Sequence, residues 1–236
     1  MAENTHPTTL GQSLPIRRAA PGDSVAVLGL GRFGGAVASE LVRLGCEVLG
    51  IDHSERTVQA YAPTLTQVVQ ADFTEAEVLR QLGVGEMSFA IVAVGSDREA
   101  SILATAALDE LAIPVIWAKA VSRQHGRILE RVGAHRVVYP EHDMGHRVAH
   151  HVGGRILEWF LLDERFALVE TVAPRELIGK TLAGSGLRAR HDVTVVCVKP
   201  AHGSYTYATP DTVIEAGDLL VVAGETQAAE AFARLS

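Results

Sequence analysis

The chain has 236 residues, of which 47% are hydrophobic and 21% are charged. This balance is typical of a globular protein with a sizeable core, and the length suits one large domain or two small ones. The formal net charge of -7 argues against non-specific nucleic-acid binding, which depends on a basic surface, so no nucleic-acid partner is expected.

Residues 1–22 are polar, contain three prolines and lack the apolar core of a signal peptide. We expect them to form a disordered leader. The longest apolar runs, such as Phe89–Val94, are too short to cross a bilayer. The sequence therefore predicts a cytoplasmic protein, whose role at a membrane would depend on a partner.

From Ser24 onward, short apolar strands alternate with helical stretches. This alternation predicts an α/β fold, a Rossmann-like parallel sheet covered on both faces, over residues 23–141. The predicted strands are Ser24–Leu28, Glu47–Ile51, Gln67–Gln70, Phe89–Val94, Val115–Ala118 and Arg136–Tyr139. The predicted helices are Phe33–Leu44, Glu55–Tyr61, Glu75–Leu82, Arg98–Leu111 and Ser122–Val132.

After Tyr139 the alternation stops. Residues 141–160 predict one longer helix, weakened at Gly145 and at 153–154, so that 142–162 form a crossover or linker helix. The remaining residues, 163–236, predict a smaller α+β domain. Its strands are expected at Phe166–Val172, Val193–Lys199, Ser204–Tyr207 and Asp218–Ala223, and its helices at Leu182–Arg190 and Thr226–Leu235.

A glycine motif lies between the first predicted strand and the first helix. Gly29, Gly31 and Gly34 have the G-x-G-x-x-G spacing, and Asp52 closes the second strand about 20 residues later. In a dinucleotide fold these glycines allow a tight turn, close approach of a pyrophosphate and close helix packing, while the acidic residue binds ribose hydroxyls. The alternatives are a glycine turn without a ligand and a strand-end turn at Asp52.

Two further residues are candidates for the nucleotide site. Asp72 follows the third predicted strand, where it lies beside adenine or caps the helix that begins near Glu75. Arg32 lies inside the glycine loop, where an arginine can reach a terminal phosphate, which favours ATP or ADP over NAD. The negative charge of Asp52 disfavours NADP.

The last segment offers no catalytic constellation, neither Ser/His/Asp, Cys/His nor paired carboxylates. We expect no large substrate domain after the nucleotide domain. We therefore expect no catalytic residue and interpret the chain as a sensor rather than an enzyme. Two alternatives stay open: an NAD-dependent oxidoreductase, and an NAD(H)-responsive redox regulator.

Several stretches together resemble the KtrA/TrkA family of potassium-uptake regulators, which combine RCK (regulator of potassium conductance) N-terminal and C-terminal domains. They are VLGLGRFGGAVASEL, EVLGIDHSERTVQAYA, FAIVAVG, IPVIWAKA and RVVYPEHDMGHRVA, and the single-copy layout is most similar to the KtrA branch. The resemblance implies homodimers that assemble into an octameric ring beneath a KtrB- or TrkH-like membrane potassium channel subunit. It further implies that ATP activates and ADP inactivates.

The resemblance also assigns residues. Asp52 would bind ribose, and Asp72 would lie beside adenine. Arg32 would reach the γ-phosphate of a nucleotide held by the neighbouring subunit. Glu141 would bind an activating cation such as Mg²⁺, although the residue alone suggests only a carboxylate favoured at a helix N-terminus. The residues near the phosphates would be Gly29, Gly31, Arg32, Phe33, Gly34 and Lys119, of which Lys119 is alternatively a solvated strand-end lysine.

The second domain resembles one that binds cyclic di-AMP in several relatives. Arg188 is the candidate phosphate contact, and Ile178 and Val195 are candidate apolar walls. Thr194 departs from the family, in which binding members tend to carry an asparagine or a similar group.

A set of histidines is not typical of the family. A mostly i, i+4 spacing predicts that several of them share one helical face, where they could bind Zn²⁺ or Ni²⁺ or sense pH. The alternative is a solvated or subunit-facing helix. The residues are His142, His146, His150 and His151.

Overall fold

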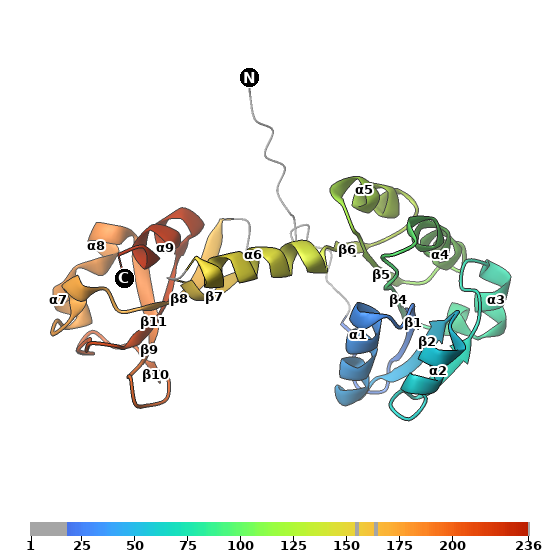
Figure 1. Ribbon diagram of the computed structural model, residues 1–236, viewed down its shortest axis with the longest axis horizontal. Coiled ribbons are helices and arrows are strands. Elements are labelled where there is room, and N and C mark those ends of the chain that lie inside the picture. Colours follow the sequence, from blue (N-terminus) through green and yellow to red (C-terminus); the bar gives the residue numbers. More distant parts are fainter. Residues whose placement is uncertain (1–17, 154–155, 163–164, 236) are drawn as a thin grey trace, which may run out of the picture. The chain divides into compact units, whose positions relative to one another are not determined.

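The structure is a computed structural model that describes residues 18–153, 156–162 and 165–235 (Figure 1). The chain divides into two compact units, the first ending at His142 and the second running from Asp143 to the C-terminus. Most of the expected leader, residues 1–22, lies outside the described residues.

The first unit contains a six-stranded parallel sheet with the strand order β3-β2-β1-β4-β5-β6. This is the doubly wound order of a Rossmann fold, in which the order reverses between β1 and β4. The predicted fold class is therefore confirmed. The strands are β1 (Ser24–Leu28), β2 (Glu47–Asp52), β3 (Gln67–Gln70), β4 (Phe89–Val92), β5 (Val115–Lys119) and β6 (Arg136–Val138).

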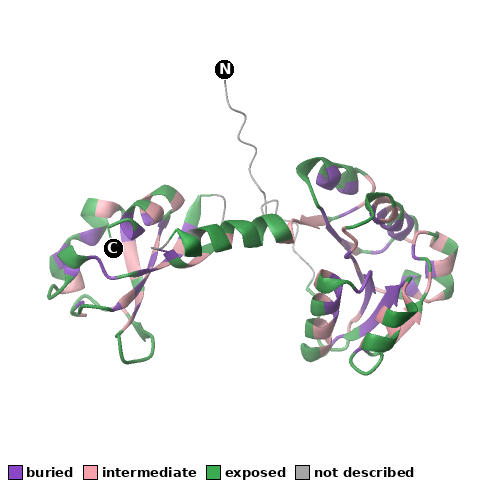
Figure 2. Cartoon of the chain, viewed as in Figure 1, coloured by how far each residue is buried: buried purple, intermediate pink, exposed green. Residues whose placement is uncertain are grey.

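Helices connect these strands and bury apolar residues on both faces of the sheet, which appears purple in Figure 2. Three helices begin at a side-chain cap, where Ser54, Asp97 and Ser122 accept hydrogen bonds from backbone N–H groups. The helices are α1 (Arg32–Arg43), α2 (Glu55–Tyr61), α3 (Ala76–Gln81), α4 (Arg98–Glu110) and α5 (Arg123–Arg131), with a 3-10 turn, η1 (Val84–Glu86).

The second unit contains a five-stranded antiparallel sheet with the order β10-β9-β11-β8-β7. One face of the sheet packs around the buried side chains of Phe232, Ile214 and Leu220. The strands are β7 (Ile156–Leu161), β8 (Phe166–Val172), β9 (Val193–Lys199), β10 (Thr206–Tyr207) and β11 (Leu219–Glu225). The helices are α7 (Leu182–Ser185), α8 (Leu187–His191) and α9 (Thr226–Ala233), with a 3-10 turn, η2 (Arg175–Leu177).

Two predicted helices are wrong in extent. The helix predicted over 141–160, and with it the linker helix over 142–162, ends early, because α6 covers Pro140–Val152 and β7 follows at Ile156. The run Ile156–Leu161 pairs with β8, and a glycine at 153 interrupts the helix before it. The helix predicted at Leu182–Arg190 is two helices, separated at Gly186, whose φ of 64° lies in the left-handed region.

Within the described ranges, no helix is long and apolar enough to cross a membrane.

Candidate functional site

The loop between β1 and α1 explains the spacing of the three glycines. Gly29 has a φ of 88°, and its N–H donates a hydrogen bond of 2.8 Å to the Ile51 carbonyl. A Cβ at Gly34 would lie 1.9 Å from the Gly29 carbonyl oxygen, so this glycine allows α1 to pack against the loop. Among the residues that the structure describes, none lies within 4 Å of a Cβ built at Gly31. The space outside Gly31 is thus open to a ligand.

The N-terminus of α1 opens toward the same space. Gly31 occupies the N-cap position without a side-chain cap, and the first turn carries no acidic residue. The backbone N–H groups of a first helical turn lack intrahelical partners and present a partial positive charge. This arrangement suits phosphate oxygens.

Asp52 ends β2 and lies against the loop. Its side chain is almost completely buried, and each carboxylate oxygen accepts one backbone hydrogen bond. Oδ2 accepts from the Leu30 N–H at 2.8 Å, and Oδ1 accepts from the Ser54 N–H at 2.9 Å. Because an ionised carboxylate has about four acceptor positions, both oxygens can still accept from ribose hydroxyls.

Asp72 is not the cap of α3. The N-cap position is Glu75, and the Asp72 Oδ1 instead accepts from the N–H and the hydroxyl of Thr74, at 2.9 and 2.7 Å. These bonds hold the pKa of Asp72 below its usual value. The capping interpretation is therefore wrong, whereas the place of Asp72 beside adenine stays a prediction.

Lys119 and Glu141 form an ion pair that the sequence did not reveal. Lys119 ends β5 and is only 9% exposed, so it is not a solvated strand-end lysine. Its Nζ lies 2.6 Å from the Glu141 Oε1 and 5.6 Å from the centre of the Phe33 ring. Gly95 leaves room for this side chain, because a Cβ there would lie 3.1 Å from Nζ. Lys119 thus reaches the beginning of α1.

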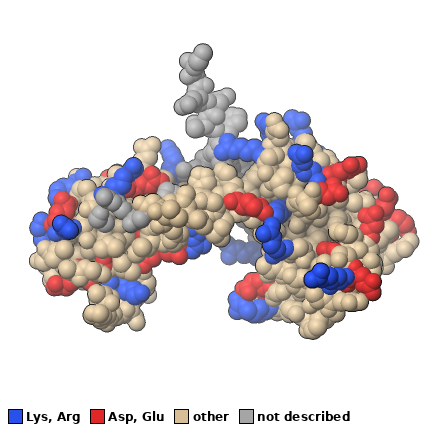
Figure 3. Space-filling view, viewed as in Figure 1, with Lys and Arg blue, Asp and Glu red and all other residues tan. Residues whose placement is uncertain are grey.

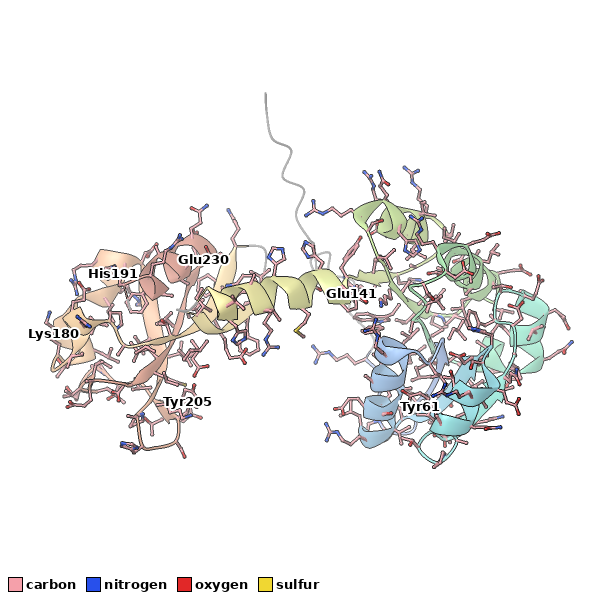
Figure 4. The ribbon with its side chains drawn as sticks, viewed as in Figure 1. Tyr61, Glu141, Lys180, His191, Tyr205 and Glu230 are labelled. Atoms are coloured by element: carbon pink, nitrogen blue, oxygen red, sulfur yellow. The ribbon has the colours of Figure 1, made fainter. Side chains whose placement is uncertain are left out.

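Glu141 lies in the first turn of α6, where Figure 4 labels it. The hydrogen bond from Lys119 holds the pKa of Glu141 below its usual value, and the positive charge of Arg32 contributes in the same direction. Figure 3 shows acidic and basic side chains interspersed on the visible face. The structure thus brings Arg32, Phe33, Lys119 and Glu141 together at one end of the sheet.

Arg188 belongs to the second unit. It lies on α8, and its Nε and Nη2 donate hydrogen bonds of 3.1 and 2.9 Å to the Thr194 hydroxyl. Ile178, which follows η2, is 39% exposed, and Val195 is partly buried on β9. Thr194, which departs from the family pattern, therefore accepts hydrogen bonds from Arg188, the candidate phosphate contact.

The histidines of α6 have different surroundings. His142 and His146 are exposed, and the His151 Nε2 lies 3.9 Å from the Glu158 Oε2. The side chain of His150 lies outside the described residues. In the part of the chain that the structure describes, no group of three or more His, Cys, Asp or Glu side chains is arranged to hold a metal ion.

Comparison with known proteins assigns both parts of the chain to known domain families. The TrkA-N domain model matches residues 25–140, and the TrkA-C domain model matches residues 166–236. The chain is 39% identical over 201 residues to the Ktr system potassium uptake protein A of Bacillus subtilis (strain 168), which covers 84% of this chain and 90% of that protein.

The chain is also 38% identical over 202 residues to the Ktr system potassium uptake protein A of Vibrio alginolyticus, which covers 84% of this chain and 91% of the relative. The crystal structure of the GsuK RCK domain superposes with a TM-score of 0.63 at 22% identity, over 98% of this chain and 50% of that one. This last likeness concerns the fold alone.

Proposed function

The chain belongs to the family of the Ktr system potassium uptake protein A, with a TrkA-N and a TrkA-C domain, and we propose that it gates a membrane potassium channel subunit in response to ATP and ADP. Membership of this family makes it a regulatory subunit of potassium transport rather than an enzyme. ATP activates and ADP inactivates. The protein acts at the inner face of the cell membrane through its KtrB- or TrkH-like partner.

The convergence of Arg32, Lys119 and Glu141 at the N-terminus of α1 carries the proposal. ATP differs from ADP by one phosphate, so only groups that reach this phosphate can favour one ligand over the other. Arg32 begins α1 and adds to the electrostatic field at Glu141. In the assembled protein, Arg32 contacts the γ-phosphate of the nucleotide in the neighbouring subunit.

Glu141 fits the role of a cation ligand. Its side chain is 66% exposed to solvent, and Lys119 contacts it through Oε1. Mg²⁺ is typically held by one or two carboxylates, with phosphate oxygens and water completing its coordination. A bound Mg²⁺ or similar cation would offset the repulsion between Glu141 and a terminal phosphate. Glu141 would hold it.

Exposed apolar side chains support assembly of several copies. Met144, Val148 and Val152 follow each other at i, i+4 on α6 and are 54%, 50% and 81% exposed. A helix face of this kind is normally buried against another apolar surface. We assign it to the homodimer contact. Leu103 on α4 and Ile128 on α5, 46% and 43% exposed, are assigned to contacts between dimers in the octameric ring.

Two other ligands belong to this proposal. NAD(H) is the alternative at the nucleotide site, because Asp52 suits a ribose diol in either ligand. Cyclic di-AMP is the candidate ligand of the second unit, with Arg188 as the phosphate contact. It requires Arg188 to exchange its bonds with Thr194 for bonds with the phosphate.

Reconstitution tests the proposal. The chain and a potassium channel subunit of the Ktr type are placed in lipid vesicles, and potassium flux is measured with ATP or ADP. We expect higher flux with ATP. Arg32→Ala should remove the difference between the two nucleotides, whereas Arg43→Ala, at the other end of α1, should preserve it. Equal flux with ATP and ADP in the unmodified protein would contradict the proposal.

A further inference from the structure

His53 lies beside the carboxylate of Asp52 at the proposed nucleotide site. It follows Asp52, the last residue of β2, and its carbonyl accepts a hydrogen bond of 3.0 Å from the Gln70 Nε2 on β3. The backbone is thereby fixed, whereas the imidazole is 84% exposed and can turn. Its Nδ1 lies 3.6 Å from the Asp52 Oδ1.

Asp52 has few acceptor positions to spare. Oδ1 already accepts from Ser54 and Oδ2 from Leu30, which leaves about one position on each oxygen. The side chain is only 8% exposed, and His53 lies beside the remaining position on Oδ1. A ribose diol that binds both oxygens must use that same position.

The charge of an imidazole changes between about pH 5 and 8. Two carboxylates interact with this ring: Asp52, whose Oδ1 lies 3.6 Å from its Nδ1, and Asp72, whose pKa is lowered in small part by the charge of the ring. A protonated ring donates from both nitrogens, and a small rotation would bring Nδ1 into hydrogen-bonding distance of Oδ1. A neutral ring lacks the positive charge that would attract its Nδ1 to the Asp52 carboxylate.

We infer that protonated His53 competes with a ribose hydroxyl for the Oδ1 of Asp52, so that the nucleotide site weakens in acid. This inference rests on the proposed role of Asp52 as the ribose ligand. His53 is a positioning residue in this account, because it acts through Asp52. The regulator would accordingly respond to pH as well as to nucleotide.

Calorimetric titration of the full chain with ADP, at about pH 8 and about pH 5.5, tests the inference. We expect unmodified protein to bind ADP about tenfold more weakly at the lower pH. His53→Asn should lose most of this difference, and His53→Lys should bind weakly at both pH values. Because the terminal phosphate of ADP titrates equally with every variant, the comparison isolates residue 53.

His202→Asn, an exposed histidine of the second unit, is the matched control and should keep the full difference. The inference is overturned if His53→Asn retains the pH ratio of the unmodified protein. If unmodified protein fails to bind ADP even at about pH 8, the proposed nucleotide site itself is wrong, and that outcome is distinct from a retained ratio.

Discussion

Lys119 and Glu141 join the end of β5 to the first turn of α6, with 2.6 Å between Nζ and Oε1. One partner is buried and the other exposed, so the pair lies where a ligand can reach it from solvent. A terminal phosphate would compete with Glu141 for Lys119, and a cation would compete with Lys119 for Glu141. In either case the ion pair that attaches the beginning of α6 to β5 is broken. We expect nucleotide to act on the rest of the chain through this change.

The ion pair predicts a specific response to acid. Since Lys119 holds the pKa of Glu141 below the ordinary value of 4.5, the folded state gains stability above that pH, and this gain is lost as the pH falls through the lower, folded pKa. Glu141→Gln should therefore show a smaller fall in unfolding temperature below about pH 4.5 than unmodified protein. An equal fall in the Glu141→Gln variant and the unmodified protein would contradict this prediction.

Two glycines of the loop should respond differently to alanine. A methyl group at Gly34 would overlap the Gly29 carbonyl, so Gly34→Ala should lose about 1–3 kcal/mol of unfolding free energy. Gly31 has a φ of -64°, and no described residue lies within 4 Å of an added Cβ, so Gly31→Ala should fold normally yet bind ATP and ADP more weakly. Denaturant unfolding and nucleotide titration measure the two effects. An unchanged nucleotide affinity in Gly31→Ala would place the phosphates elsewhere.

His125 predicts a second pH effect, in stability. It is 3% exposed, and in the described part of the chain its Nε2 has no hydrogen-bond partner. Burial, with a contribution from Arg98, lowers its pKa below the ordinary 6.5. The unfolded chain therefore takes up the proton first, so stability is full above about pH 6.5 and declines below it. His125→Gln should flatten this decline in thermal unfolding, and a decline of unchanged size would assign it to other groups.

The pair between Arg147 and Glu158 attaches α6 to β7 within the second unit. The Arg147 Nε lies 3.1 Å from the Glu158 Oε2, and the guanidinium carbon lies 5.5 Å from the centre of the Phe160 ring. A double-mutant cycle with Arg147→Met and Glu158→Gln should give a coupling of about 0.5–1 kcal/mol in unfolding experiments. The single variants should keep the nucleotide affinity of the unmodified protein. In the flux assay they should lose part of the difference in potassium flux between ATP and ADP. If both variants keep the full difference in flux between ATP and ADP, the Arg147–Glu158 pair takes no part in gating.

Thr194 should limit binding of cyclic di-AMP. Arg188 donates two hydrogen bonds to its hydroxyl, and these bonds must break before the guanidinium can contact a phosphate. We expect Thr194→Asn to strengthen binding of cyclic di-AMP in equilibrium dialysis and Arg188→Ala to abolish it. Arg175→Ala, on η2, is the control. Equal affinities of the Arg188 variant and the unmodified protein would contradict the assignment.

The sequence predicted most of the first unit because its signals are local. Each strand is an apolar run that ends at a turn, and the fingerprint from Gly29 to Asp52 fixes where two strand ends meet. β7 could not be recognised in the same way, because its apolar residues also fit a helical period. Pairing with β8, which is set by tertiary structure, decides its conformation.

The contacts of the site also depend on tertiary structure. Lys119 and Glu141 are 22 positions apart, and neither residue type indicates the other. Asp72 shows the limit within a short segment: the same carboxylate can cap a helix or bind Thr74 two residues later, and only the position at which α3 begins distinguishes them. The resemblance singled out both Arg188 and Thr194. Their hydrogen bonds could not be predicted, because they depend on how the chain turns between α8 and β9.

Calorimetric titration of one preparation with ATP, ADP and NADH tests the nucleotide-sensing account most directly. The account predicts that ATP and ADP both bind, that NADH binds at least about tenfold more weakly, and that Arg32→Ala weakens ATP more than ADP. Much tighter binding of NADH than of ATP would contradict the account and favour an NAD(H)-responsive regulator.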